Sequence, residues 1–327
     1  MTPMQTEPVQ RRTDIEALYW APLLELLYQA ATIHRQYHNS QKVQLAELLS
    51  LKTGGCQENC KYCAQSSYHR TGVTPTKLMT LEEVKEIAHK AKANGVTRLC
   101  MGTAWRSVQN NAEFERILEM ISYVASIGLE PCTTLGLLSE EQAQRLKSAG
   151  CHSYNHNLDT SARFYPSIVT THTYQDRLNT IHAVKKAGLS LCSGGILGMG
   201  ETDNDRIDLI TTLASLSPAS IPINTLVKVP GTPLAESPPI HFWELLRMVA
   251  ACRIAVPKAK IRLSAGRVEL SQAEQALCFL AGANGLHTSG KLLTTPTYQI
   301  EEDKSLLSIL GLLPEETESD CSLECPS

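Results

Sequence analysis

From about residue 43 onward, the chain alternates between short apolar runs and longer amphipathic segments with helical periodicity. Each apolar run ends in small or polar residues, as strands do where they enter a loop. Turn signals and helix-capping residues separate the runs. The pattern predicts eight strands, at residues 45–52, 96–101, 129–134, 151–159, 189–193, 220–227, 260–264 and 285–288.

The segments between these runs carry the start and stop signals of helices. Two S/T-x-x-E/Q capping boxes are predicted, Thr80 with Glu83 and Ser139 with Gln142. Glycines stand where helix C′ residues belong, at Gly95, Gly128, Gly150 and Gly188. Eight strands alternating with helices over about 250 residues predict an α/β fold, a (β/α)8 TIM-type barrel. A doubly wound sheet stays open as the alternative, because the eighth strand has the weakest pattern.

The two ends of the chain differ from this alternation. Residues 1–12 form a polar arm, and Thr13 with Glu16 predicts a capping box that opens one helix reaching about His34. After about Thr297 the chain is acidic and rich in small residues, which predicts a short helix followed by a loose tail. We therefore divide the chain into an N-terminal arm and helix (1–42), the barrel (43–297) and a C-terminal helix and tail (298–327).

Composition narrows the class of protein. A hydrophobic content of 43% and a charged content of 19% exclude a disordered chain. The net charge of −3 supplies no field that would neutralise phosphates, so we expect no nucleic-acid partner. No apolar run reaches 18 residues and the N-terminus has no apolar signal region, so we expect no membrane partner. These features predict a cytoplasmic, reducing compartment, where clustered cysteines more often serve metal or redox chemistry than disulfides.

The 11 cysteines are the compositional anomaly, and three of them lie within eight residues: Cys56, Cys60 and Cys63. They follow a Gly-Gly pair at the end of the first predicted strand. A structural zinc ion would require a fourth ligand, for which no familiar spacing exists nearby. Three thiolates suit a [4Fe–4S] cluster that keeps one iron open. Three incidental thiols on a glycine-rich loop are the weaker interpretation, because cysteine is usually buried.

The Cx3Cx2C spacing, with an aromatic residue before the last cysteine, resembles the radical S-adenosylmethionine (SAM) superfamily. Residues 40–300 further resemble the biotin synthase family, in the segments LKTGGCQENCKYCAQSS, LCMGTAWR, YNHNLDTS, CSGGILGMGE, PINTLVKVPGTPL, IRLSAGR and KLLTTP. The resemblance implies that Cys56, Cys60 and Cys63 hold the [4Fe–4S] cluster, whose open iron binds SAM. It also implies the reaction, a radical insertion of sulfur into dethiobiotin between C9 and C6, which is the last step of biotin biosynthesis.

Three further cysteines, Cys100, Cys132 and Cys192, stand near the ends of separate predicted strands. By themselves they read as buried structural thiols, although strand alternation could turn them into one cavity. The resemblance implies that they hold a [2Fe–2S] cluster that donates sulfide, with Arg262 as the fourth ligand. From chemistry alone Arg262 is a hydrogen-bond donor to sulfur, since a protonated guanidinium has no free lone pair.

Polar side chains at the predicted barrel mouth complete the candidate site. Period-2 alternation places Asn155, Asn157 and Asp159 on one face and turns His156 away as a packing residue. The resemblance implies that Asn157 and Asp159 bind the ribose of SAM and that Asn157 and Asn224 bind the ureido ring of the substrate. It also gives SAM contacts to Tyr62, Gly194, Gly195, Ile196, Gly198 and Glu201, and places Thr294 and Thr295 near the substrate carboxylate.

Several points stay open in the sequence. Residues 287–290 (HTSG) are less typical of the family than the following KLLTTP, which leaves the lining at the eighth strand undecided. The five cysteines without a role are Cys151, Cys252, Cys278, Cys321 and Cys325.

Two alternative functions stay open: another radical SAM enzyme on the same barrel, or an iron–sulfur electron carrier without a substrate. The family suggests a homodimer and a low-potential electron donor such as a flavodoxin or ferredoxin.

Overall fold

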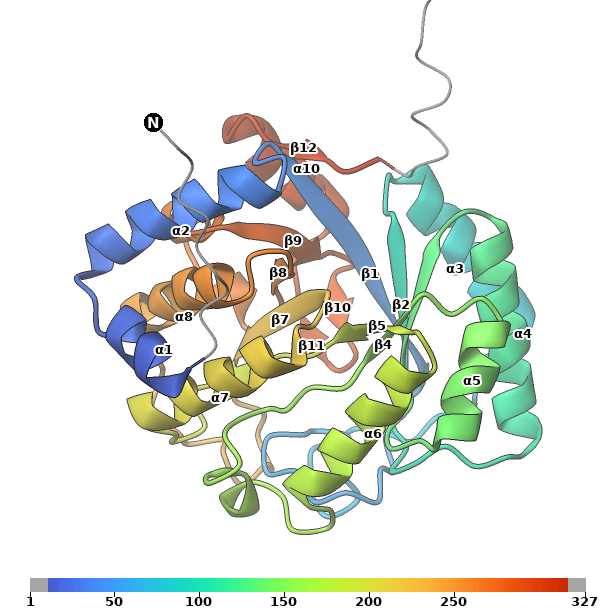
Figure 1. The fold of residues 1–327 in the computed structure, drawn as a ribbon. Coiled ribbons are helices and arrows are strands. Elements are labelled where there is room, and N and C mark those ends of the chain that lie inside the picture. The colour runs from blue at the N-terminus through green and yellow to red at the C-terminus, as the bar shows by residue number, and fades with distance from the viewer. Residues whose placement is uncertain (1–10, 317–327) are drawn as a thin grey trace, which may run out of the picture.

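The computed structural model describes residues 11–316. Its main sheet is a closed parallel barrel, in which each strand pairs with its neighbour and the last strand pairs with the first (Figure 1). The strands are β1(Lys42–Lys52), β2(Arg98–Thr103), β3(Glu130–Thr134), β4(Ser153–Asn155), β5(Ser190–Cys192), β6(Gly195–Leu197), β7(Ser220–Thr225), β8(Lys260–Leu263) and β9(Ala283–His287). A strand lies within or across each of the eight predicted segments, although β4 covers only three residues of the predicted 151–159. The pairing of β9 with β1 makes the fold a (β/α)8 barrel rather than an open sheet.

The fifth barrel strand is interrupted, so that β5 and β6 both pair with β7. The break falls at Ser193 and Gly194. A Cβ atom at Gly194 would lie 1.9 Å from the carbonyl oxygen of Pro222, so only glycine fits this close approach of two backbones. The sequence pattern predicted one short strand here and missed β6.

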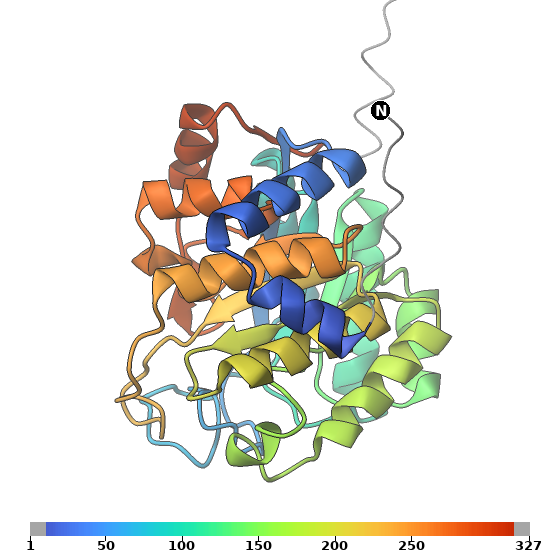
Figure 2. The same cartoon turned by 60° about the vertical axis from the view of Figure 1, so that its left-hand side comes forward.

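Seven helices cover the outside of the barrel, one in each connection between successive strands (Figures 1 and 2). They are α3(Leu81–Ala93), α4(Ala112–Ser126), α5(Glu140–Ser148), α6(Tyr174–Lys186), α7(Asp203–Leu216), α8(Phe242–Ala255) and α9(Gln272–Leu280). Both predicted capping boxes form, at Thr80 and at Ser139. The four predicted C′ glycines have positive φ, the conformation that terminates a helix.

The N-terminal segment differs from the prediction. Two helices replace the single one, α1(Arg12–Tyr19) and α2(Leu23–Tyr37), and they pack outside α7 and α8 (Figure 2). Pro22 separates them because its ring excludes a continuous helix, and it serves as the N-cap of α2. The predicted capping box at Thr13 is wrong, since α1 already begins at Arg12 and has no side-chain cap.

The C-terminal segment contains the predicted short helix, α10(Ile300–Ile309). Instead of continuing loosely, the chain then forms β12(Leu313–Pro314), which pairs with the start of β1. A small hairpin of β10(Lys291–Leu292) and β11(Thr295–Pro296) precedes α10 and was not predicted. Cys321 and Cys325 lie outside the described residues, and the division at residues 42 and 297 stays a prediction. Within residues 11–316, no helix is long and apolar enough to cross a membrane.

The buried His34 and the half-buried His38, where α2 meets α8, predict a pH dependence of stability. Burial, together with the charge of Arg253, lowers the pKa of His34 to about 3 and that of His38 to about 4. In the unfolded chain both titrate near 6.5, so protons favour unfolding below that pH. We expect the free energy of unfolding to fall by about 1 kcal/mol per histidine between pH 7.5 and pH 5.5, and to keep falling toward the folded pKa values.

Urea unfolding of the iron-free protein at the two pH values measures this effect. His34→Leu should reduce the difference between the two pH values, because it removes one of the titrating groups. The exposed His182 provides the matched control, and His182→Leu should retain the full difference. An unchanged difference in His34→Leu would contradict the prediction.

Candidate active site in the barrel

A cavity of about 340 Å³ occupies the barrel and opens at the carboxyl ends of the strands. Its wall contains both cysteine sets singled out in the sequence. The loop that follows β1, light blue at the bottom of Figure 1, supplies Cys56, Cys60 and Cys63, and the strands supply Cys100, Cys132, Cys192 and Arg262. Both cysteine sets therefore face one enclosed space.

Backbone hydrogen bonds fold the cysteine loop back on itself. The amide of Cys63 donates to the carbonyl of Cys60 (2.9 Å), and the amide of Cys56 donates to the carbonyl of Gln65 (3.0 Å). Gly54, at φ 75°, makes the sharp turn out of β1, where a side chain would press on Pro75. Burial raises the pKa of Cys63 to about 11 and also raises the pKa values of Cys56 and Cys60. Metal binding here must displace protons from thiols.

The same loop is fastened to the segment between β4 and α6. The Glu58 carboxylate lies 2.8 Å from Nδ1 of His172, whose Nε2 lies 2.7 Å from the hydroxyl of Tyr165. Asn59 accepts hydrogen bonds from the amides of Thr170 and Thr171. These contacts fix the three loop cysteines relative to the loop after β4, which carries Asp159.

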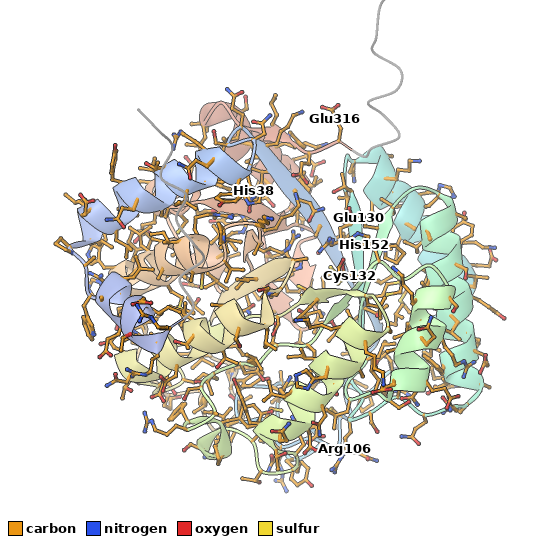
Figure 3. The ribbon with its side chains drawn as sticks, viewed as in Figure 1. His38, Arg106, Glu130, Cys132, His152 and Glu316 are labelled. Atoms are coloured by element: carbon orange, nitrogen blue, oxygen red, sulfur yellow. The ribbon has the colours of Figure 1, made fainter. Side chains whose placement is uncertain are left out.

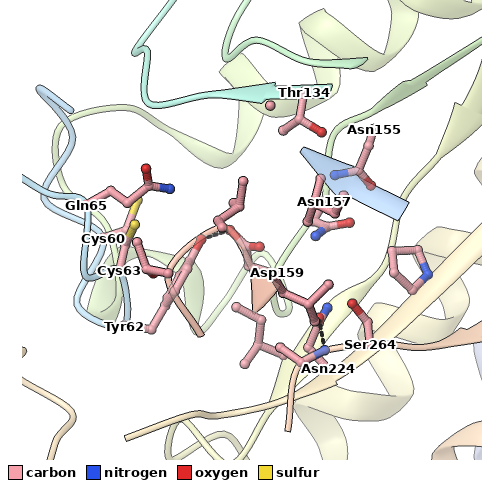
Figure 4. A pocket seen from close by; sticks show the side chains of 18 of the residues that line it. Cys60, Tyr62, Cys63, Gln65, Thr134, Asn155, Asn157, Asp159, Asn224 and Ser264 are labelled. Atoms are coloured by element: carbon pink, nitrogen blue, oxygen red, sulfur yellow. Dashed lines mark hydrogen bonds between the residues drawn. The ribbon is translucent and has the colours of Figure 1, made fainter. Parts of the chain in front are cut away.

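Asp159 is the polar centre of the cavity mouth (Figure 4). Its Oδ2 accepts a hydrogen bond from the hydroxyl of Tyr62 (2.8 Å) and pairs with Nη2 of Arg177 (2.7 Å). The backbone of Asp159 has φ 65°, a left-handed conformation that few non-glycine residues adopt and that aspartate tolerates better than most. Arg177, on α6, was missed in the sequence because it resembled an ordinary solvated helix charge. The structure buries it and pairs it with Asp159.

Alternation fails beyond Asn155, because β4 already ends there. Asn155 at the end of β4, and Asn157 and Asp159 in the loop that follows, nevertheless all line the cavity (Figure 4). The prediction that His156 faces away is wrong, since it lines the same cavity although it is buried. Oδ1 of Asn155 is buried and has no hydrogen-bond partner among the described residues, which marks a place for a polar ligand atom.

The remaining predicted ligand contacts divide into two groups. Tyr62, Asn224, Thr294, Thr295 and Ile196 line the cavity. The wall of the cavity does not include Gly194, Gly195, Gly198 or Glu201, and the Glu201 carboxylate instead accepts the amides of Gly198 (2.9 Å) and Met199 (2.8 Å). Glu201 therefore closes the turn after β6, and SAM contacts from these four residues stay a prediction.

The second cysteine set lies deeper, between the strands. Cys100 and Cys132 are register partners on β2 and β3, and Cys192 on β5 joins them in one buried cluster. Hydrogen bonding within this cluster lowers the pKa values of Cys100 and Cys192 and raises that of Cys132. The three thiols therefore interact as one set, and the thiolate is the form that binds metals.

Arg262 and Arg98 bring positive charge to this buried thiol set. Arg262, only 1% exposed, donates to the carbonyl of Leu286 (2.9 Å) and to Oε1 of Gln44 (2.5 Å). Arg98 pairs with Glu130 at 2.8 Å, at the barrel end opposite Arg106 (Figure 3). Burial and the neighbouring charge of Arg98 lower the pKa of Arg262.

Each cysteine set offers the donor chemistry that an iron–sulfur cluster requires. Among residues 11–316, no three His, Cys, Asp or Glu side chains converge closely enough to hold one metal ion. In an iron–sulfur cluster the thiolates bind different iron atoms, so their sulfur atoms lie farther apart than around a single ion. The donor chemistry, three thiols in each set with no disulfide among the described cysteines, matches that requirement.

The buried Asp159–Arg177 pair makes a stability prediction. Arg177→Met leaves the Asp159 carboxylate buried with only the Tyr62 hydroxyl as partner, and removing one member of such a pair typically costs about 3 kcal/mol. We expect a loss of that size in urea unfolding of the iron-free protein. The double variant Arg177→Met, Asp159→Asn should regain part of it, because the unpaired charge is gone. Equal losses in the two variants would show that the charge is not the cause.

Comparison with protein families divides the chain into two matched parts. Residues 50–213 match the radical SAM superfamily, and residues 222–313 match the biotin and thiamin synthesis associated domain. The chain is 52% identical to a biotin synthase of Nostoc punctiforme over 91% of both chains. It is 50% identical to the mitochondrial biotin synthase of Arabidopsis thaliana, over 93% of this chain and 81% of the relative.

Solved structures agree on the fold. Methylornithine synthase superposes with a TM-score of 0.79 at 18% identity, over 96% of each chain. HydG, a maturase of the [FeFe]-hydrogenase, superposes with a TM-score of 0.81 at 17% identity, over 94% of this chain and 72% of HydG. At these identities the structural likeness establishes the barrel architecture and carries no information about the substrate.

Proposed function

Because the chain belongs to the biotin synthase family of the radical SAM superfamily, we propose that its two cysteine sets divide one reaction between them. The family reaction is the radical insertion of sulfur into dethiobiotin between C9 and C6, and it makes the protein a sulfurtransferase. In this proposal Cys56, Cys60 and Cys63 hold a [4Fe–4S] cluster. Cys100, Cys132, Cys192 and Arg262 hold a [2Fe–2S] cluster.

Once bound, the first cluster and SAM together supply the 5′-deoxyadenosyl radical, and the second cluster supplies sulfide. The protein contributes position and enclosure. Unactivated C–H bonds have no acidity that a base could use, so the chain needs no general base near the carbons. It must instead hold them close to the radical source, which rigid strands do better than mobile loops.

The polar residues of the mouth suit the two organic ligands. Asn157 and Asn224 carry amides, whose donor and acceptor atoms complement the N–H and C=O groups of a cyclic urea. Their carboxamide oxygens accept the backbone amides of Gly194 (3.1 Å) and Ala265 (3.1 Å), which orients both side chains. Asp159 and Tyr62 stand beside the loop cysteines, where the ribose and adenine of SAM are proposed to bind. Thr294 and Thr295 are proposed to contact the substrate carboxylate.

The observation that carries the proposal is the shared cavity. Its wall includes three loop cysteines at the mouth, three strand cysteines in the interior and the polar Asn157–Asn224 region. A pure electron carrier would require no such ligand pocket. Three buried thiols grouped in the interior, with Arg262 lining the same cavity, favour a sulfur-donating cluster over a radical SAM relative with a different reaction.

Anaerobic reconstitution with iron and sulfide tests the proposal. The protein is then incubated with dithionite, SAM and dethiobiotin, and the products are identified by mass spectrometry. We expect biotin together with 5′-deoxyadenosine. Formation of 5′-deoxyadenosine without biotin would assign the chain another radical reaction.

We further propose a homodimer, a low-potential flavodoxin or ferredoxin as the electron donor, and a cytoplasmic location. These proposals are supported by the family resemblance. Sedimentation of the reconstituted protein at two concentrations tests the dimer, and a monomer at both would contradict it. Replacement of dithionite by reduced flavodoxin tests the donor.

A further inference from the structure

His287 has a place in the cavity that the proposed reaction does not use. It is the last residue of β9, it is 8% exposed, and it lines the cavity. Its Nε2 atom lies 3.9 Å from Sγ of Cys100, which stands on β2. A buried imidazole that faces a proposed cluster ligand calls for an explanation.

His287 on β9 can approach Cys100 on β2 because Ala46, on the strand between them, is small. Strand β1 pairs with both β9 and β2, and Ala46 on β1 is the register partner of His287. Ala46 is fully buried and contacts the cysteine cluster with only a methyl group. Its small side chain leaves the imidazole free to reach across β1 toward Cys100.

The other ring nitrogen is also engaged. Nδ1 of His287 lies 3.0 Å from Oγ of Ser264, which faces the cavity from the end of β8 (Figure 4). A neutral imidazole has one N–H group, which either ring nitrogen can carry. When the Ser264 hydroxyl donates to Nδ1, that N–H group is on Nε2 and points at Cys100.

The backbone of His287 is held equally firmly. Its carbonyl accepts hydrogen bonds from Nη2 of Arg267 (3.1 Å) and from the hydroxyl of Thr297 (3.3 Å). Arg267 in turn pairs with Asp303 of α10 at 2.6 Å, in a fully buried ion pair. The backbone position of His287 is therefore fixed, and its ring has one hydrogen-bond partner, Ser264, besides the Cys100 thiol.

We propose that His287 is a positioning residue, whose Nε2–H donates a hydrogen bond to the Cys100 thiolate of the second cluster, in the tautomer selected by Ser264. The proposal rests on the proposed function, because it requires the [2Fe–2S] cluster at Cys100. A thiolate can only accept, so cluster binding and this tautomer support each other. Hydrogen bonds to cluster sulfur stabilise the reduced, more negative state and raise the reduction potential.

The potential of the second cluster is the readout, and we would measure it in full-length protein that carries Cys60→Ala. That background prevents the first cluster from forming, so the visible absorption reports the second cluster alone. His287→Phe keeps an aromatic ring and removes the donor, and we expect the potential to shift to more negative values. His287→Gln retains an N–H donor and should restore the potential toward that of the parent. Ser264→Ala, which frees the tautomer, should give a smaller negative shift.

An unchanged potential in His287→Phe would overturn the proposal. Loss of cluster iron from both His287→Phe and His287→Gln would also overturn it, because a residue that binds iron directly is not a hydrogen-bond donor to Cys100. Failure of the proposed function looks different, since then the Cys60→Ala parent itself would hold no iron or labile sulfide.

Discussion

Replacing Cys192 with alanine is expected to abolish biotin formation while SAM is still cleaved to 5′-deoxyadenosine. The variant loses one thiolate of the buried strand set, whereas the loop cysteines at the mouth stay intact. Radical generation and sulfur donation are thereby separated. Biotin should fall to the level of a sample without enzyme, and the visible absorption of the second cluster should be lost.

A matched control distinguishes the loss of a ligand from the loss of a buried thiol. Cys278, on α9, is fully buried and belongs to the outer apolar core. Cys278→Ala removes the same atom from a comparable environment and should retain biotin formation. Normal biotin yield from Cys192→Ala would refute the assignment of the second cluster to this set.

The complementary change, Cys60→Ala, should eliminate both products. Cys60 is 7% exposed and lies at the centre of the loop set, where its carbonyl accepts the amide of Cys63. With two thiolates left, the loop cannot hold the [4Fe–4S] cluster, so SAM is not cleaved. The strand cysteines are on separate elements, so iron and labile sulfide of the second cluster should remain at about two atoms each per chain.

Cys151→Ala is the control for this variant. Cys151 is buried near β3 and hydrogen bonds to the carbonyl of Ser153 at 3.1 Å, outside the cavity wall. It should cleave SAM and form biotin as the parent does. Formation of 5′-deoxyadenosine by Cys60→Ala would contradict the assignment of the loop cysteines.

Much of the fold could be predicted because strand and helix periodicities are local properties. Capping boxes at Thr80 and Ser139, and glycines after the helices, are determined by a few neighbouring residues. Pro22 is an equally local signal, because a proline ring interrupts a helix wherever it stands in the interior. The break between β5 and β6 was not predictable in this way, because it depends on the carbonyl of Pro222 on another strand.

In the candidate site, too, local patterns could be predicted, whereas contacts made by the fold could not. The loop cysteines were found by their spacing, which is local. The chemistry of Arg177 and His287 depends on partners brought together by the fold, Asp159 for the first and Cys100 for the second. Alternation also failed to place His156, because β4 ends at Asn155 and the chain beyond it no longer has a period of two.

The most direct test of the central claim follows the sulfur atom. The protein is reconstituted with iron and ³⁴S-sulfide, freed of unbound sulfide, and allowed a single turnover with SAM and dethiobiotin in buffer containing only natural-abundance sulfur. If a cluster bound by Cys100, Cys132, Cys192 and Arg262 donates the sulfur, the biotin formed carries ³⁴S and is two mass units heavier. Unlabelled biotin from this sample, or labelled biotin from Cys192→Ala, would contradict the account.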